Sequence, residues 1–566
     1  MVNKPAPRIC LLVFILCIVF YPVFSQDKKT TKIEIKRADI LIGNEAKGVR
    51  KLIGNVHLRH DNVDMFCDSA YLYTKENSMD AYGHVHIKQG DTLQLWGDSL
   101  KYNANTRIAQ LRHNVRVRDQ DMTLTTDYLD YDRNNDLAYY IGGGHIVSRT
   151  ERNDLKSEVG YYYPKSKNFH FKRNVVLINP DYQIYSDTLL YNTLSKVTYF
   201  FGPTTIRSEG NTIYCENGWY STASNIAQFK KNAWILTGSQ KVEGDSIYYD
   251  RNKGIGEAYF NVIITDTTED FQLNGEKAIH YEEDSVSIIT ENAMLTQFFS
   301  TDTLYLHADT LFATYDSTRK HRVMHAWYHV KFFKPDMQGK CDSLIFSDAD
   351  STITLFSDPV MWSEANQMIG DSIRILMYDG EVRKLFMDRN AFITSEVDTT
   401  KYNQIKGKNM IGWFRENRLR KIDVTGNGQT VYYATGDNGK IIGMNRAECS
   451  DMVIYIDSNE VQQITFFKDP TATLYPLDQV NASESILKGF QWRGDIRPLK
   501  KEEIFIWGVI PRDTITAPLD TLKQGDIDKL EEQPRDQIES TEDEKKEAGK
   551  DKKDKPKGRM GAKKKE

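Results

Sequence analysis

Residues 97–102 of the chain read Gly-Asp-Ser-Leu-Lys-Tyr, and variants of this pattern return along most of the sequence. The copies share a small residue, an acid, often Ser or Thr, an apolar residue, any residue, and then Tyr or Phe. The acids of successive copies stand 29 to 33 residues apart and are Asp39, Asp68, Asp98, Asp127, Glu158, Asp187, Glu216, Asp245, Glu276, Asp309, Asp342 and Asp371. A near-constant period over this many copies indicates a repeat protein.

A second motif runs in phase with the first. Residues 54–58 read Gly-Asn-Val-His-Leu, and residues 83–87 read Gly-His-Val-His-Ile. Each unit of about 30 residues therefore holds two extended runs, such as 79–88 and 92–102, in which apolar and polar residues alternate as in a half-buried strand. The alternation slips at residues 97–98, which predicts a bend or bulge in the strand there.

This pattern predicts an all-β fold, an elongated repeat array of bent antiparallel strands. The first halves of the strands build one sheet and the second halves another, and the two sheets face each other as an open V with apolar side chains between them. The units are regular over residues 26–294, and 295–510 is predicted to be a less regular continuation of the array. Residues 511–566 are polar and end in a Lys-rich run, which predicts a disordered charged tail.

The first 25 residues have the features of a secretory signal peptide. Lys4 and Arg8 precede an apolar run from Ile9 to Phe24, and small residues allow cleavage after Ser25. An uncleaved membrane anchor is the alternative, although the run of about 16 residues is short for a spanning helix. The chain is therefore expected to work outside the cytoplasm. Its formal charge of -5 over 566 residues gives no reason to expect a nucleic-acid partner.

No chemistry-bearing site stands out. A dozen equivalent acids argue against catalysis, and we expect these acids to accept hydrogen bonds from backbone N–H groups freed at the strand bends. His321, His325 and His329 lie in a predicted strand, where four residues span about 13 Å, too far for one metal ion. The sequence therefore predicts a protein that is not an enzyme, with no catalytic residues, no metal and no cofactor. Cys67, Cys215, Cys341 and Cys449 are expected to be buried free thiols.

The apolar inner face of the predicted sheets is the candidate binding surface. It allows two interpretations, a closed core or an open groove for the acyl chains of a lipid. The candidate groove residues are Val56, Leu58, Leu93, Leu95, Leu100, Tyr102, Leu129 and Tyr131.

The phased Gly-Asn-Val and Asp-x-apolar-x-Tyr units behind a signal peptide resemble the OstA/LptA family. The resemblance covers roughly residues 30–480, and its best copies are residues 54–56 and 97–102. It implies a V-shaped two-sheet β-jelly roll that holds lipopolysaccharide or a related lipid by its acyl chains. It also implies a periplasmic protein that joins inner-membrane and outer-membrane components of lipopolysaccharide transport by end-to-end β-strand addition, for which residues 33–35 offer an edge. This chain is longer than a single-domain member and carries a charged tail.

Two functions follow from these patterns. The first is a lipid-transport bridge in outer-membrane biogenesis, located in the periplasm, with association with the inner or outer membrane left open. The alternative is a non-enzymatic envelope scaffold, or surface β-repeat protein, with a closed core. A scaffold would be sealed and would bind neither detergent nor lipid.

Overall fold

The computed structural model describes residues 31–512, apart from gaps at 45, 91–92, 120–121, 379–380, 437–438 and 458–459. The predicted signal peptide at 1–25 and nearly all of the predicted tail at 511–566 lie outside the described residues. The chain divides into two units, Met1–Ile510 and Pro511–Glu566, and the text below concerns the described residues of the first. No helix within the described ranges is long and apolar enough to cross a membrane.

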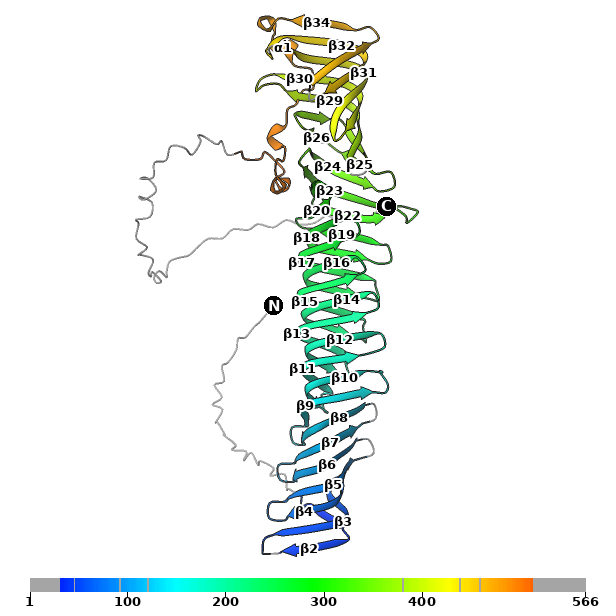
Figure 1. Ribbon diagram of the computed structural model, residues 1–566, viewed down its shortest axis with the longest axis vertical. Coiled ribbons are helices and arrows are strands. Elements are labelled where there is room, and N and C mark those ends of the chain that lie inside the picture. Colours follow the sequence, from blue (N-terminus) through cyan, green and yellow to red (C-terminus); the bar gives the residue numbers. More distant parts are fainter. Residues whose placement is uncertain are drawn as a thin grey trace, which may run out of the picture. The chain divides into compact units, whose positions relative to one another are not determined.

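The described residues are almost entirely strands, as the sequence predicted (Figure 1). The first part holds two short strands and then sixteen long ones. They are β1 (Glu34–Arg37), β2 (Ile40–Asn44), β3 (Val49–His60), β4 (Val63–Tyr73), β5 (Ser78–Gln89), β6 (Leu93–Asn103), β7 (Ile108–Arg118), β8 (Met122–Asp132), β9 (Leu137–Ser148), β10 (Asp154–Tyr163), β11 (Asn168–Ile178), β12 (Tyr182–Asn192), β13 (Val197–Ser208), β14 (Asn211–Ser221), β15 (Ile226–Thr237), β16 (Gln240–Asp250), β17 (Ile255–Asp266) and β18 (Phe271–Tyr281).

From Val286 onward the strand lengths become uneven. Several strands are interrupted at the bend, and the later ones are longer. They are β19 (Val286–Thr290), β20 (Met294–Phe298), β21 (Thr303–His307), β22 (Thr310–Tyr315), β23 (Arg322–Lys334), β24 (Met337–Ser347), β25 (Thr352–Phe356), β26 (Val360–Ser363), β27 (Asn366–Ile369), β28 (Ser372–Tyr378), β29 (Glu381–Glu396), β30 (Tyr402–Arg415), β31 (Arg418–Thr435), β32 (Ile441–Asp457), β33 (Glu460–Phe467) and β34 (Thr471–Tyr475).

Consecutive long strands pair antiparallel, and each bends near its middle. In the pairing of β5 with β6, Tyr82 lies opposite Ser99 and Val85 opposite Gly97. Gly83 and His84 together therefore face the single residue Asp98, which makes a β-bulge. The bend predicted at the Gly-Asp motif is confirmed, and the extra residue of the bulge belongs to the second motif, on the neighbouring strand.

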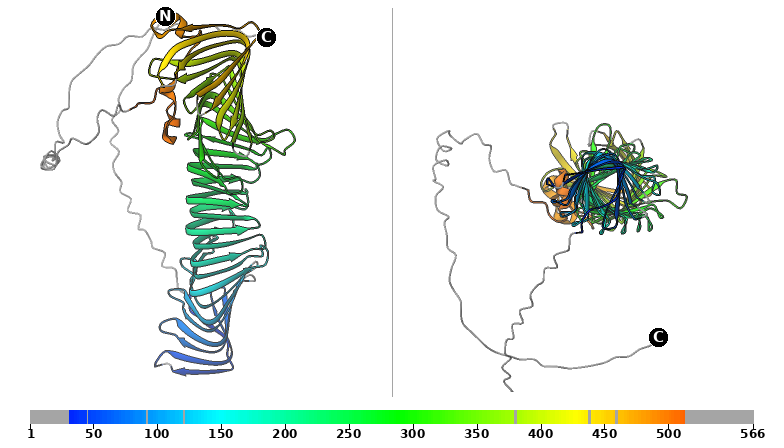
Figure 2. Two further views of the ribbon diagram at one scale, coloured as in Figure 1. Left: turned by 45° about the horizontal axis from the view of Figure 1, so that its top comes forward. Right: turned by 90° about the horizontal axis from the view of Figure 1, so that it is seen from below.

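The two halves of each strand belong to two sheets. This is clearest at β18, where residues 271–274 pair with β20 and residues 277–281 pair with β19. Beyond this point one set of half-strands continues through β20 and β21, and the other through β19 and β22. Figure 2 shows the strands curving around a common interior.

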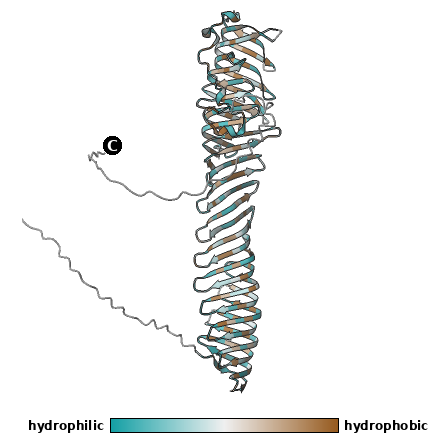
Figure 3. Cartoon of the chain, turned by 90° about the vertical axis from the view of Figure 1, so that its left-hand side faces the viewer, coloured by the Kyte–Doolittle hydropathy of each residue, from teal (hydrophilic) through white to brown (hydrophobic). Residues whose placement is uncertain are grey.

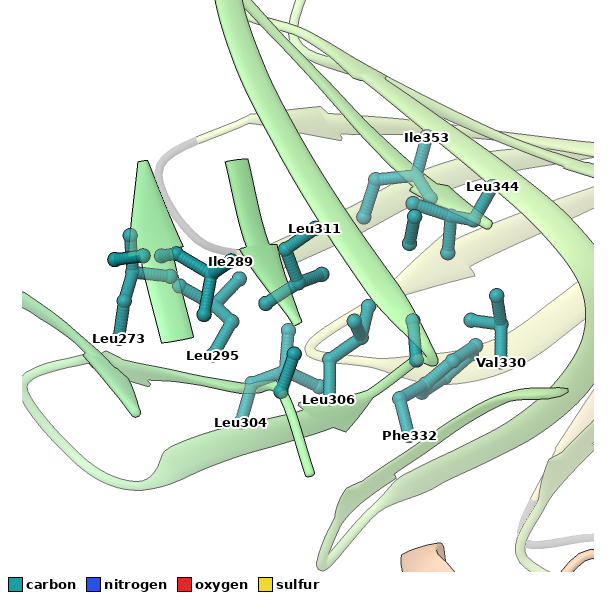
Figure 4. Close-up of a cluster of buried hydrophobic side chains, with 14 of the residues drawn as sticks. Leu273, Ile289, Leu295, Leu304, Leu306, Leu311, Val330, Phe332, Leu344 and Ile353 are labelled. Carbon is teal, nitrogen blue, oxygen red and sulfur yellow. The ribbon is translucent and has the colours of Figure 1, made fainter. Parts of the chain in front are cut away.

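Apolar side chains face the interior in two large clusters. One runs from Ile33 to Leu129, and the other from Leu155 to Ile456. Hydrophobic and hydrophilic residues alternate along the strands (Figure 3), so that one face of each strand is available to these clusters. In the second cluster the cross-strand neighbours Leu273, Leu295, Leu306 and Phe332 lie together (Figure 4).

Residues 476–510 fall in the part of the chain predicted to continue the strand array, and they form a strap without strands. The strap contains the short helices η1 (Leu477–Gln479), α1 (Ala482–Ser485), η2 (Gly494–Ile496) and η3 (Lys501–Phe505). It runs back over strands already formed, since Gln404 of β30, Gln367 of β27 and Gln338 of β24 bond to it in turn. All three glutamine side chains are buried beneath the strap.

Candidate functional site

A large hollow lies between the two sheets, from the start of β8 to β19. Its volume is about 1760 Å³. Apolar side chains form its walls and include Leu155, Phe169, Phe171, Leu177, Ile184, Leu189, Phe200, Ile206, Ile213, Phe229, Ile235, Val242, Ile247 and Ile264. A cavity of this size and lining can hold a large apolar ligand.

Strand register places these residues in two rows. On one sheet Leu177 pairs with Ile184, Ile184 with Ile206, and the row continues to Ile264. On the other sheet Phe171 pairs with Leu189, and Leu189 with Phe200. Because alternate residues of a strand point to the same face, each row presents a continuous apolar wall to the cavity.

The mouth of the cavity lies between two series of hairpin turns, which we call the first lip and the second lip. The first lip consists of turns 164–167, 193–196, 222–225, 251–254 and 282–285, and the second of turns 149–153, 179–181, 209–210, 238–239 and 267–270. Side chains of both lips line the cavity. The Tyr191 hydroxyl at the end of β12 joins the two sides, because it lies within hydrogen-bond distance of both carboxylate oxygens of Glu151 on the second lip, Oε1 at 3.1 Å and Oε2 at 3.3 Å. Burial and the neighbouring Glu151 carboxylate raise the pKa of Tyr191.

The eight residues predicted to form a groove lie elsewhere. Val56, Leu58, Leu95, Leu100, Tyr102 and Leu129 are buried in the N-terminal cluster, and Leu93 and Tyr131 pack against it half-buried. None of the eight is among the residues that line the cavity. In this conformation they form a packed core, and their role as a groove stays a prediction.

The two sheets are tied shut beside this core by a group of side chains that we call the seam clasp, His60, Asp61, Tyr102, Arg107 and Arg133. Asp61 pairs with Arg107 at 3.4 Å and with Arg133 at 3.7 Å, and His60 Nδ1 lies 2.7 Å from the Tyr102 hydroxyl oxygen. The two ion pairs join Asp61, in the turn after β3, to Arg107 in the turn after β6 and to Arg133 in the turn after β8. The N-terminal part of the interior is therefore closed, whereas the middle part is hollow.

The recurring acids hold the strand bends together. Asn55, Asn114, Asn232 and Asn261 each donate a side-chain hydrogen bond of 2.7–2.9 Å to the acid 16 residues earlier. His84 lies 2.8 Å from Asp68 in the equivalent position. Glu276 also accepts a hydrogen bond from the backbone N–H of Asn261, and at a later bend Asp451 accepts one from the backbone N–H of Gly426. The predicted structural role fits these bonds, but the usual donor is the side chain of the second motif.

The remaining candidate residues from the sequence are histidines and cysteines. His325 and His329 lie on β23, and His329 lies 2.8 Å from Asp309 at a strand bend. No group of three or more His, Cys, Asp or Glu that could hold a metal is found within the described ranges. The four cysteines are free, and three of them are buried. Burial raises the pKa of Cys67 to about 11 and that of Cys215 to about 12.

The cavity itself was not located from the sequence. Its walls carry the same alternation as the closed N-terminal part, so the pattern alone does not distinguish them. The available signal was the recurrence of Phe171, Phe200 and Phe229 at one inner position of the middle units. The register places Leu52, Ala81 and Leu111 at the same position of the N-terminal units.

Comparison with known proteins gives one family. Residues 30–187 and 184–245 match the family model described as OstA-like protein. No curated protein matches the chain. Among solved structures, one similar chain is LptH, described as the LptA homologous periplasmic component of the lipopolysaccharide transport device from Pseudomonas aeruginosa. It is 17% identical, with a TM-score of 0.14, over 25% of this chain and 82% of that one.

Proposed function

Since residues 30–245 match the OstA-like family model, we propose that the chain binds lipid during lipopolysaccharide transport and holds acyl chains in the cavity between its sheets. The cavity is the observation that carries this proposal. It is lined by apolar side chains on both sheets, and each buried CH₂ group of a ligand contributes about 0.8 kcal/mol. A few acyl chains would bind firmly there without a dedicated polar site.

The sealed scaffold is the second candidate, and the N-terminal part of the chain favours it locally. There the clasp and the packed core leave the eight predicted residues little exposed. A scaffold gains nothing from a hollow of about 1760 Å³, because unfilled apolar space forfeits packing contacts. The hollow middle therefore supports lipid binding over a purely structural role.

The location and partners belong to the same proposal. The chain would act in the periplasm as a transport protein without catalytic activity, and would meet inner-membrane and outer-membrane transport components at its end strands. Strand β2 offers such an end, because β3 is its one pairing partner among the described strands and because Ile40, Leu41 and Ile42 are exposed.

Photo-crosslinking in cells tests the proposal. A photoreactive residue at Phe171 or Phe229 is expected to yield a lipopolysaccharide adduct, because both side chains line the cavity. The outward-facing neighbour Tyr161, which does not line the cavity, is the matched control and is expected to yield none. The same residue at Leu95 or Leu129 tests the predicted groove in the N-terminal part. A folded, exported protein without adducts at Phe171 and Phe229 would favour the sealed scaffold.

A further inference from the structure

The charges that line the cavity mouth are segregated between its lips. On the first lip the charged lining residues are Lys167, Lys196, Arg251 and Glu282, of which three are basic. On the second lip they are Glu151, Asp181 and Glu209, all acidic. Glu257 of β17, just beyond turn 251–254, also lines the cavity, so the positive part of the first lip is the stretch that holds Lys167 and Lys196. The second lip across the cavity is negative.

The backbone fixes the positions of the basic residues. The Thr193 N–H donates to the Lys167 carbonyl at 3.1 Å, and the Thr222 N–H donates to the Lys196 carbonyl at 3.0 Å. These bonds join successive turns of the first lip, so Lys167 and Lys196 stand two strands apart, about 10 Å. Arg251 lies two turns further, about 20 Å beyond Lys196 by the same spacing.

The cations that line the cavity differ from their neighbours in the same turns. Lys165 pairs with Asp136 at 2.8 Å, and Lys253 pairs with Asp250 at 3.1 Å, and neither lines the cavity. Lys167 Nζ lies 3.5 Å from the Tyr162 hydroxyl oxygen. No carboxylate lies in ion-pair contact with Lys167, Lys196 or Arg251 in the part of the chain that the structure describes. Their charge is therefore left for a ligand.

We propose that the first lip is an anion subsite, in which Lys167 and Lys196 bind the phosphate-bearing headgroup of the amphiphile whose acyl chains fill the cavity. This inference rests on the proposed function and adds the chemistry and orientation of the ligand. The acidic second lip repels the same headgroup, so the ligand is seated with its phosphates toward the first lip. Lysine binds phosphate as a point charge, and the interaction strengthens beside an apolar wall that excludes water.

The test compares two probes on the full-length protein, diphosphorylated lipid A and the same lipid A after phosphatase treatment. The variant Lys167→Gln/Lys196→Gln is expected to bind the phosphorylated probe roughly tenfold more weakly, since two partly exposed ion pairs are removed. Its affinity for the dephosphorylated probe should stay within about threefold of wild type, because the apolar walls are unchanged. The matched control Lys165→Gln/Lys253→Gln removes the same charge from the same series of turns and should bind both probes as wild type does. Lys167→Arg/Lys196→Arg should restore binding and shows that the glutamine variant failed through charge.

Each result separates this inference from the proposed function. Wild-type protein that binds neither probe contradicts lipid binding itself. Wild-type protein that binds both probes equally keeps the cavity as a lipid site and overturns the anion subsite. Equal losses in the test and control variants also overturn it, because net charge would then explain the effect. Asp181→Asn/Glu209→Gln should strengthen binding of the phosphorylated probe alone, and unchanged binding would contradict the repulsion assigned to the second lip.

Discussion

The hydrogen bond between Asn114 and Asp98 at a strand bend is expected to contribute measurably to local stability. Asn114 Nδ2 donates to Asp98 Oδ2 at 2.7 Å, and Asn114 has a φ of 48°. Replacement of Asn114 by Ala removes the hydrogen bond. It also puts Ala into a left-handed backbone conformation, which Ala tolerates less well than Asn does. The bond to a charged acceptor on an exposed surface contributes about 1 kcal/mol, and the backbone conformation about 1 kcal/mol more.

We therefore expect Asn114→Ala to lower the free energy of local opening by about 2 kcal/mol and Asn114→Gly by about 1 kcal/mol, because Gly adopts positive φ freely. Asp98→Ala should cost about 1 kcal/mol and should add little to Asn114→Gly, since both remove the same bond. Native-state hydrogen exchange of the amides of β6, β7 and β8 is the suitable assay. A repeat array does not unfold as one two-state unit, so a single melting temperature would average over the molecule.

Equal losses for Asn114→Ala and Asn114→Gly would refute the backbone part of this reasoning. Additive losses for Asp98→Ala and Asn114→Gly would refute the hydrogen bond. Either result would also weaken the structural role assigned to the equivalent pairs in the other units.

Three further predictions concern other parts of the chain. Gly83→Ala should destabilise β5 by at least about 1 kcal/mol more than Gly90→Ala does. An added Cβ at Gly83 would lie 2.3 Å from Asp68 Oδ2, whereas an added Cβ at Gly90 meets nothing within 4 Å. Hydrogen exchange of the β5 amides measures the difference, and equal effects would exclude the steric cause. Gln367→Leu should loosen the strap, because the buried Gln367 side chain accepts a hydrogen bond from the Arg493 N–H at 2.7 Å. The Arg493 amide should then exchange faster, which corresponds to a loss of about 2 kcal/mol of local stability. The exposed Gln463→Leu is the control and should leave exchange of the Arg493 amide unchanged. The seam clasp should weaken in acid, because a hydrogen bond from the Thr31 hydroxyl and the nearby His60, Arg107 and Arg133 side chains hold the pKa of Asp61 below its ordinary 3.8. The stabilising contribution of Asp61 is therefore complete above that value and is lost as pH falls through the lowered pKa. Asp61→Asn should abolish this loss of protection in β3 and β4, and an unchanged acid dependence in that variant would show that another group titrates.

The repeat and its bends could be predicted from the sequence because they depend on neighbours. The period of 29 to 33 residues, the alternation and the slip at residues 97–98 are all local, and they yield the strands, their order and the bulges. The hydrogen-bond partner of the recurring acid was harder to predict from the sequence. Asn114 lies 16 residues from Asp98, and only the register of adjacent strands brings the two together.

The position of the cavity could not be predicted, because one apolar row runs through both the closed and the hollow parts. Leu58 and Ile184 belong to the same row of paired residues, which passes through Leu95 and Leu155. The two sheets are tied shut beside Leu58 by Asp61, whose partners are 46 and 72 residues away at Arg107 and Arg133. Such distant contacts leave no periodic signal.

The strap was missed for a related reason. Gln338, Gln367 and Gln404 are polar residues in strands, and alternation correctly assigns such residues to the side of the sheet away from the core. Their burial depends on residues 487–497, which lie more than 80 positions further along the chain.

The side-chain ties at the strand bends have a consequence for how this molecule could have arisen. Each tie reaches back only 16 residues in the regular units, so it is completed within a unit and the one before it. A duplicated segment of one period would bring its own acid and its own Asn, and would find the same partners in the preceding copy. Length is then a property that gene duplication can adjust in steps without redesigning the fold, and the capacity of the interior would grow by the same steps.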